Sequence, residues 1–146
     1  AGDLVEQTDA DGNRRHYANL CMNGADVFSF TLREVPTAIA AVLRQAGWEA
    51  AKTDALVLHQ ANTFMMQSLA KKTGYAEAQV PTGAFERYGN QSSASIPAAL
   101  IEGLGGRLEA ESLRVVGCGY GVGLSWGAFA GEIGPITVCP IQSFPR

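Results

Sequence analysis

The sequence of 146 residues has few charged side chains and no long apolar run. Charged residues make up 17% of the chain, against about 25% in an average soluble domain. Apolar residues make up 47%, which is too many for a disordered chain. The longest unbroken apolar run, residues 38–43, is far shorter than the ~18 residues needed to cross a bilayer. The sequence therefore predicts a folded domain without a membrane-spanning segment.

Cysteine, clustered basic residues and signal-peptide features are also scarce. The three cysteines, Cys21, Cys118 and Cys139, show no C-x-x-C spacing, so neither a disulfide framework nor a metal site is expected. Residues 1–16 are polar and contain no apolar stretch of signal-peptide length. The formal net charge is −3, with lysines and arginines scattered along the chain, which argues against a nucleic-acid partner. These features predict a cytoplasmic protein with neither nucleic acid nor membrane as its partner.

The apolar periodicity predicts layers of helices and strands. Asp11-Gly12 is expected to form a turn between two short extended stretches, and Pro36 is expected to kink or divide the first helix. Gly74 is expected to cap the C-terminus of a second helix, at residues 61–73. The predicted order is a helix at 26–46, a buried strand at 55–58, a helix at 61–73, a helix from Ser93 or Ser95 to Leu104 that Gly105-Gly106 ends, a strand at 113–119, a glycine turn and a strand at 124–133. Three strands make a small sheet, so we expect a partner or further polypeptide to complete it.

Two polar residues lie where α/β folds carry out chemistry. His59 follows the buried strand and precedes a helix, at the strand end where such sheets place their active sites; a core histidine bonded to a backbone carbonyl is the equally good alternative. Asn90 follows a glycine, which by itself is ordinary turn chemistry. Together, two neutral donors and a backbone N–H from the glycine turn can stabilise an enolate or a tetrahedral oxyanion.

The glycine-rich stretch also contains two misleading patterns. Residues 123–127 match G-x-S-x-G, the nucleophile elbow of serine hydrolases. The residues after Ser125 alternate as a strand, and both histidines precede it, so this function is not expected. Residues 117–123 suggest a dinucleotide loop, but no helix follows to hold a pyrophosphate. Cys118 lies inside a predicted strand and is interpreted as a buried apolar thiol.

Three sequence blocks together resemble a known enzyme family. They are His-Gln-Ala-Asn at 59–62, Tyr-Gly-Asn-Gln-Ser-Ser-Ala-Ser-Ile-Pro at 88–97 and Gly-Tyr-Gly-Val-Gly-Leu-Ser-Trp-Gly-Ala at 119–128. This pattern resembles the C-terminal half of β-ketoacyl-acyl carrier protein synthase III, of the thiolase-like superfamily, from about Leu20 to Ile133. The resemblance implies an α/β fold, the C-terminal half of an αβαβα arrangement. Residues 1–19 would be a polar segment continuing from a missing N-terminal half, and residues 20–146 would be the C-terminal domain.

The resemblance also implies an activity. The family condenses an acyl thioester with a malonyl thioester by a decarboxylative Claisen reaction, with thioesters of CoA or acyl carrier protein as substrates and no permanently bound cofactor. The nucleophilic cysteine belongs to the N-terminal half, so we expect this chain to need that half as its partner and to be inactive alone. The complete enzyme would be a homodimer. Two alternatives stay open: an acyltransferase of the same family, with His59 as general base, and a non-catalytic partner subunit.

The motif match assigns roles to individual residues. His59 and Asn90 would be the two members of the Cys-His-Asn triad present in this chain, donating hydrogen bonds to the malonyl thioester. The backbone N–H of Val122 would form one half of the oxyanion hole. Tyr120 stands where the family commonly has phenylalanine, and Gln91 replaces the more usual threonine. The region that receives the phosphopantetheine arm and the acyl carrier would comprise Gln60, Ala61, Asn62, Thr63, Phe64, Asn23, Gly24 and Phe28.

Overall fold

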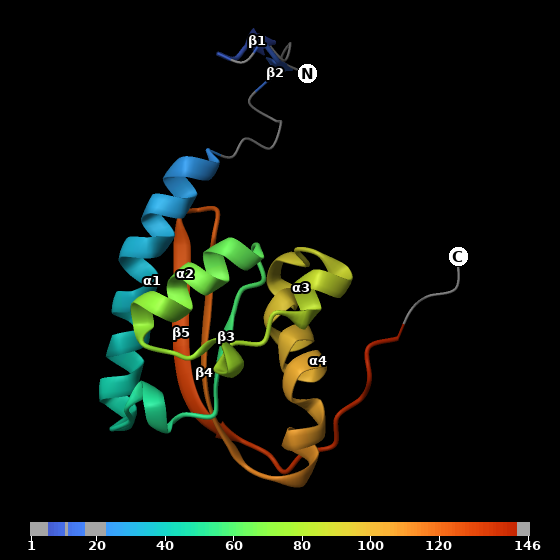
Figure 1. The fold of residues 1–146 in the computed structure, drawn as a ribbon. Coiled ribbons are helices and arrows are strands. Elements are labelled where there is room, and N and C mark those ends of the chain that lie inside the picture. The colour runs from blue at the N-terminus through green and yellow to red at the C-terminus, as the bar shows by residue number, and fades with distance from the viewer. Residues whose placement is uncertain (1–5, 11, 17–22, 143–146) are drawn as a thin grey trace.

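The body of the protein is a three-stranded sheet with helices on both faces (Figure 1). The computed structural model describes residues 6–10, 12–16 and 23–142. The sheet has the order β3-β4-β5, in which β3 is parallel to β4 and β5 is antiparallel to it. Its strands are β3 (Ala55–Leu58), β4 (Leu113–Gly121) and β5 (Ser125–Ile133). All three were predicted, and β4 runs two residues further than expected.

Near the N-terminus, β1 (Gln7–Thr8) and β2 (Arg14–Arg15) form a short antiparallel hairpin. Gly12 lies between them with a φ of +83°, a left-handed conformation that glycine adopts without steric cost. The predicted turn at this position is therefore confirmed for Gly12, whereas Asp11 lies outside the described residues.

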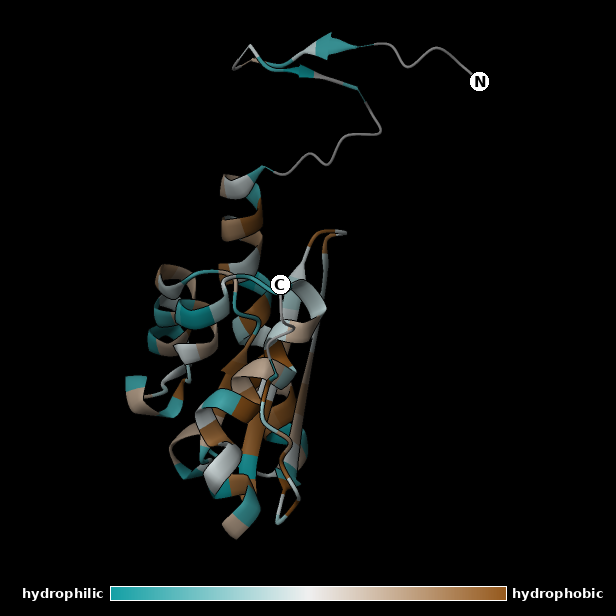
Figure 2. Cartoon of the chain, turned by 90° about the vertical axis from the view of Figure 1, so that its right-hand side faces the viewer, coloured by the Kyte–Doolittle hydropathy of each residue, from teal (hydrophilic) through white to brown (hydrophobic). Residues whose placement is uncertain are grey.

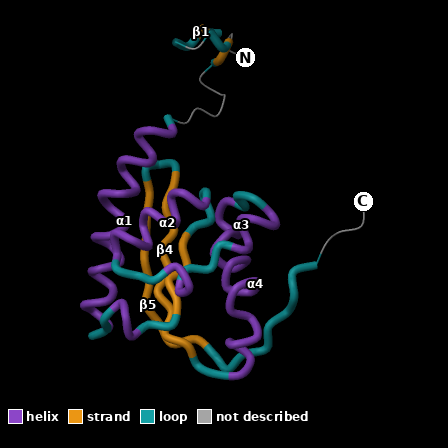
Figure 3. The backbone as a smooth tube through the Cα atoms, in the orientation of Figure 1, coloured by secondary structure: helices purple, strands orange, loops and turns teal. Residues whose placement is uncertain are grey.

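The two faces of the sheet carry different helices. α1 (Gly24–Ala46) and α2 (Thr63–Thr73) cover one face, and α3 (Gly83–Tyr88) and α4 (Ser95–Ala110) lie on the other (Figures 1 and 3). Leu56 and Leu58 of β3 belong to the core on the α1 side, and Ala55 and Val57 to the core on the α4 side. All four are fully buried, as expected for a strand covered on both faces. Short 3₁₀ turns connect the elements: η1 (Ala50–Lys52), η2 (Glu77–Gln79) and η3 (Ser92–Ala94).

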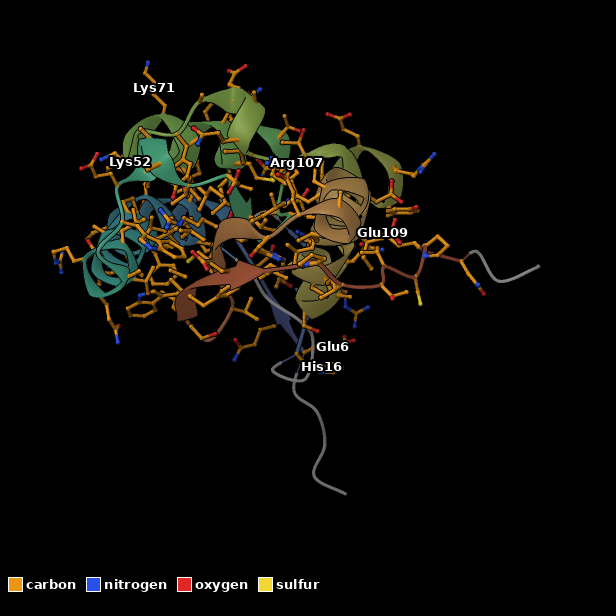
Figure 4. The ribbon with its side chains drawn as sticks, turned by 90° about the horizontal axis from the view of Figure 1, so that it is seen from below. Glu6, His16, Lys52, Lys71, Arg107 and Glu109 are labelled. Atoms are coloured by element: carbon orange, nitrogen blue, oxygen red, sulfur yellow. The ribbon has the colours of Figure 1, made fainter. Side chains whose placement is uncertain are left out.

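Hydropathy follows these layers. Apolar residues gather on the sheet between the helices, and polar residues lie mostly on the outer helix surfaces (Figure 2). The charged side chains of Lys52, Lys71 and Glu109 lie at the periphery (Figure 4). Arg107 on α4 joins two carboxylates, those of Asp54 before β3 and Glu111 after the helix, each at 2.8 Å.

Helix α1 runs through Pro36 as one continuous helix, so of the two expected effects, a kink or a division, the division does not occur. Proline has no N–H, which leaves the carbonyl of Leu32, four residues earlier, without its helical donor. The ammonium group of Lys72 on α2 donates to that carbonyl at 2.7 Å. A side chain from the neighbouring helix therefore replaces the lost backbone hydrogen bond.

Helix α4 corrects the sequence prediction at both ends. It continues to Ala110, so Gly105-Gly106 do not end it, and two of its glycines, Gly103 and Gly105, serve close packing. A Cβ on Gly103 would overlap the ring of Pro81, and one on Gly105 would meet Val138 at 3.3 Å. At the other end neither Ser93 nor Ser95 caps the helix: the cap residue is Ala94. Helix α3, short and mostly polar on its exposed side, was not predicted.

The β4–β5 hairpin was largely anticipated. Gly119 and Gly121 belong to β4 and not to the turn, so only Gly123 is in the turn, with a φ of +141°. Trp126 contacts Phe30 of α1, with ring centroids 5.1 Å apart. Alternate residues of β5, Ala128 and Ala130, pack on the same side. Trp126 is nevertheless 46% exposed, and Leu124, which precedes the strand, is 49% exposed.

The packing of α4 predicts opposite effects for two neighbouring glycines. Gly103→Ala should destabilise the fold by roughly 1 to 3 kcal/mol, because the new methyl group overpacks against a rigid proline ring. Gly106→Ala should stabilise it by about 0.5 to 1 kcal/mol, since nothing lies within 4 Å of a Cβ at this position. Urea denaturation followed by circular dichroism measures both. Equal stability of the two variants would contradict this account of α4.

Candidate active site

His59 directly follows strand β3 and is positioned by contacts with the C-terminal part of β4. The backbone N–H of His59 donates to the carbonyl of Cys118 at 2.9 Å, which extends the strand pairing by one residue. The Tyr120 hydroxyl donates to the carbonyl of His59 at 3.1 Å. The two rings also meet edge to face, with centroids 5.4 Å apart. Backbone and ring of His59 are therefore both positioned by β4.

The imidazole of His59 contacts the first residue of α4. Its Nδ1 lies 2.7 Å from Oγ of Ser95, a side chain that is 1% exposed. Ser95 in turn donates to the carbonyl of Ser92 at 2.8 Å. Burial lowers the pKa of His59 below its ordinary value of 6.5, and the nearby Ser92 carbonyl partly opposes this shift. The ring is therefore neutral at pH 7.

Asn90 belongs to the same hydrogen-bonded network. It lies in the loop after α3, and its Oδ1 accepts from the backbone N–H of Ser92 at 2.9 Å. Its Nδ2 has no hydrogen-bond partner among the described residues, and the side chain is exposed. Ser92 has a φ of +53°, which is uncommon for a residue with a Cβ. Ser92 thus joins the two parts of the network. Its N–H bonds to Asn90, and its carbonyl bonds to Ser95, which contacts His59.

Val122 lies in the turn that follows β4 and is 58% exposed. Its carbonyl accepts from Oγ of Ser125 at 3.0 Å, and Ser125 begins strand β5. A serine at the start of a strand is not on a strand-to-helix turn, which agrees with the exclusion of a hydrolase elbow. Tyr120, which contacts His59, precedes Val122 by two residues. The turn therefore continues directly from the part of β4 that contacts His59.

The residues assigned to the phosphopantetheine region fall into three structural groups. Asn23 and Asn62 are the N-caps of α1 and α2, and Oδ1 of Asn62 accepts from Met65 N at 2.8 Å. Gly24 and Thr63 begin those helices. The second group is a stacked aromatic pair, described next.

Phe28 of α1 and Phe64 of α2 stack with their ring centroids 5.6 Å apart and their planes inclined by 19°. Phe64 is 68% exposed, which is the highest value among the large apolar side chains described. Phe28 itself is partly buried against the core on the α1 side, so Phe64 is the exposed member of the pair.

Gln60 and Ala61 are enclosed by the fold. Gln60 is fully buried; its Nε2 donates to the carbonyls of Leu58 and Pro81 at 2.9 and 3.2 Å, and its Oε1 accepts from Phe85 N at 3.3 Å. It therefore ties the end of β3 to helix α3. Ala61 packs against the core on the α1 side.

Sequence reasoning missed the role of Ser95, which it considered only as a helix cap. No local pattern distinguishes a capping serine from one that meets a side chain 36 positions away. It also missed that Oε1 of Gln91 is buried without a hydrogen-bond partner among the described residues.

Cys118 has none of the properties of a catalytic nucleophile. It is fully buried, and burial raises the pKa of its thiol to about 12, so the reactive thiolate is rare at neutral pH. The interpretation as a buried apolar thiol is confirmed. Cys139 is exposed, and Cys21 lies outside the described residues. Within the described ranges, no three His, Cys, Asp or Glu side chains gather as a metal site, and no helix has the length and apolarity to span a membrane.

The family of the chain follows from comparison with known sequences. The profile of the 3-oxoacyl-[acyl-carrier-protein] synthase III C-terminal family matches residues 43–133. The chain belongs to this family. Its resemblance to the C-terminal half of β-ketoacyl-acyl carrier protein synthase III, a thiolase-like enzyme, is thereby confirmed.

Individual synthase III proteins agree with this assignment. The β-ketoacyl-[acyl-carrier-protein] synthase III of Symbiobacterium thermophilum is 44% identical over 116 residues, which cover 79% of this chain and 34% of the relative. The structure of a 3-oxoacyl-(acyl-carrier protein) synthase from Burkholderia xenovorans superposes with a TM-score of 0.78 and 40% identity, over 82% of this chain and 34% of that one. The structure of the synthase III from Thermus thermophilus superposes with a TM-score of 0.75 and 34% identity. The match covers 87% of this chain and 39% of that one. The chain thus spans about a third of the length of the synthase III relatives it matches.

The contrast between the two described cysteines predicts their reactivity. Iodoacetamide at pH 8 should alkylate Cys139 in the folded chain and leave Cys118 unmodified over the same period, because Cys118 is both inaccessible and protonated. Peptide mass spectrometry measures the two sites separately, and denatured chain provides the control in which both react. Rapid alkylation of Cys118 in the folded protein would contradict the buried, raised-pKa thiol.

Proposed function

We propose that this chain provides the malonyl-thioester part of the active site of a decarboxylative condensing enzyme. The observation that carries the proposal is the network in which Ser92 and Ser95 connect Asn90 to His59. Its two ends each have a nitrogen without a partner among the described residues: Nε2 of His59 and Nδ2 of Asn90. Nδ2 of Asn90 carries hydrogens in its ordinary form, and Nε2 of His59 can donate when it is protonated. Two such donors held by one rigid network suit a single developing oxyanion, because donors act best when they are already oriented.

The chemistry requires a place for negative charge. When the malonyl carboxylate leaves as carbon dioxide, the electron pair of the broken C–C bond moves into the thioester and forms an enolate. Hydrogen bonds from His59 and Asn90 to the thioester oxygen strengthen as this charge develops. The enolate carbon then attacks the acyl thioester on a cysteine that the N-terminal half would supply, and the cysteine thiolate leaves. The backbone N–H of Val122 would stabilise the tetrahedral oxyanion of that second step.

The substrates proposed are thioesters of CoA or of acyl carrier protein. The exposed ring of Phe64 stacks on the partly buried ring of Phe28, in the N-terminal parts of α2 and α1, and this apolar surface suits the apolar portions of a phosphopantetheine arm. No permanently bound cofactor is required. We further propose that the chain works with its N-terminal half in a homodimer, in the cytoplasm; the free thiols of Cys118 and Cys139 are compatible with a reducing compartment.

Acyl transfer without decarboxylation is the second candidate. The lowered pKa of His59 favours it, since a neutral imidazole can accept the proton of an attacking hydroxyl or amine. Release of carbon dioxide from the malonyl group distinguishes the two candidate reactions, because only condensation requires it.

The test compares three variants of the enzyme assembled from this chain and its N-terminal half. His59→Ala and Asn90→Ala should each lower the rate of carbon dioxide release from a malonyl thioester by roughly a hundred- to a thousandfold, the usual effect of removing one oxyanion donor. Acylation of the cysteine should change far less. Ser125→Ala should cost less than tenfold, because this hydroxyl bonds only to the Val122 carbonyl.

Carbon dioxide release and acyl-enzyme formation are measured side by side with radiolabelled substrates. The chain alone should form no stable acyl-enzyme, since it has no suitable nucleophile. Loss of activity in Ser125→Ala with retention in Asn90→Ala would overturn the proposal. Acyl transfer to a hydroxyl or amine without carbon dioxide release would establish the second candidate.

A further inference from the structure

The hydroxyl of Ser95 contacts two groups that make different demands on its single hydrogen. The carbonyl of Ser92, 2.8 Å away, can only accept a hydrogen bond. Nδ1 of His59, 2.7 Å away, donates or accepts according to the tautomer of the ring. If the hydroxyl donated to Nδ1, two oxygens would face each other at 2.8 Å with no hydrogen between them. Both contacts are hydrogen bonds only when Ser95 donates to Ser92 and His59 donates to Ser95.

We propose that Ser95 is a positioning residue that holds the neutral imidazole of His59 in its Nδ1–H tautomer, so that Nε2 is left unprotonated. Nε2 has no hydrogen-bond partner among the described residues, whereas Nδ1 has a short contact with a fully enclosed serine.

The surroundings of the ring hold this arrangement in place. Ser95 is 1% exposed, so water does not compete for its oxygen. The edge-to-face contact with Tyr120 and the hydrogen bond from its hydroxyl to the His59 carbonyl restrict the ring and the backbone. The titratable groups beside His59 are Tyr120 and Cys118, both from β4, and burial raises the pKa of each, that of Cys118 to about 12. Neither is charged at neutral pH, and the neighbouring residues from α4 and η3 are serines.

This tautomer gives the two protonation states of His59 different roles, a consequence that rests on the proposed function. Neutral His59 presents a lone pair at Nε2 and can accept a proton. Only the imidazolium carries a hydrogen on Nε2 and can donate to an enolate oxygen. If His59 acts as that donor, condensation falls as the pH rises through the pKa of His59. If His59 acts as a base in acyl transfer, the rate rises over the same pH interval.

The tautomer can be measured directly by ¹⁵N NMR of histidine-labelled chain. The sequence has two histidines, so His16 serves as the internal reference. Above the pKa of His59, two-bond ¹H–¹⁵N spectra should show a protonated Nδ1 and an unprotonated Nε2. Ser95→Ala removes the acceptor of the Nδ1 hydrogen and should lower the ratio of the Nδ1–H to the Nε2–H form by about 2- to 10-fold, the effect of one hydrogen bond. Ser93→Ala, an exposed serine of the same turn, should leave the ratio unchanged.

Two results would overturn the proposal: an Nε2–H tautomer for His59 in the unaltered chain, or an unchanged ratio in folded Ser95→Ala. If Ser95→Ala fails to fold, the unaltered chain and Ser95→Thr, which keeps the oxygen and should keep the Nδ1–H form, decide the question. The spectrum requires neither substrate nor the N-terminal half. Absence of condensing activity would therefore refute the proposed function and leave the tautomer assignment intact, and the reverse holds as well.

Discussion

The site depends on the parallel pairing of β3 with β4. β3 is only four residues long and completely buried, so burial on both faces and one neighbouring strand hold it in position. The pairing continues one residue beyond the strand, where His59 N–H bonds to the Cys118 carbonyl. Because Tyr120 follows on the same strand, its ring and hydroxyl reach His59. A shift of this register by one residue would exchange the two faces of β3 and remove His59 from the site.

The loop that carries Asn90 is ordered by its own polar groups. Ser92 adopts a left-handed conformation that costs on the order of 1 kcal/mol for a residue with a Cβ. The hydrogen bonds from Ser92 N–H to Asn90 and from Ser95 to the Ser92 carbonyl stabilise it. The first of these bonds occupies Oδ1 of Asn90 and leaves its Nδ2 available, and the second places the Ser95 hydroxyl beside Nδ1 of His59. The loop that holds Ser92 in its strained conformation is therefore the same loop that orients Asn90 and Ser95.

Near the site, helix α4 lies close to the segment that precedes α3. Gly103 of α4 lies against Pro81, whose carbonyl accepts from the buried Gln60 amide. The Oε1 of Gln60 also accepts from the N–H of Phe85, so the buried Gln60 and the adjoining Pro81 join α3, α4 and the end of β3. The charged pairs, such as Arg107 with Asp54, lie at the surface and contribute little by comparison.

The sequence by itself determined the elements whose burial repeats regularly. The strand at 55–58, the helices that end at Gly47 and Gly74, and the strand after the glycine turn follow from apolar spacing and glycine caps, which are local properties. His59 and Asn90 could be selected as candidates because strand ends and motif blocks are also visible locally.

Tertiary structure decided everything that depends on contacts between distant residues. Pro36 stays inside a continuous helix because Lys72 supplies a donor from another helix, and Gly105-Gly106 do not end α4, in which Gly105 is packed against Val138. Ser95 meets His59 across 36 positions, so its role could not be predicted from helix-cap preferences. Local patterns fix backbone preference and the buried face, whereas the hydrogen-bond partner of a polar side chain is decided only when the chain folds and brings the two groups together.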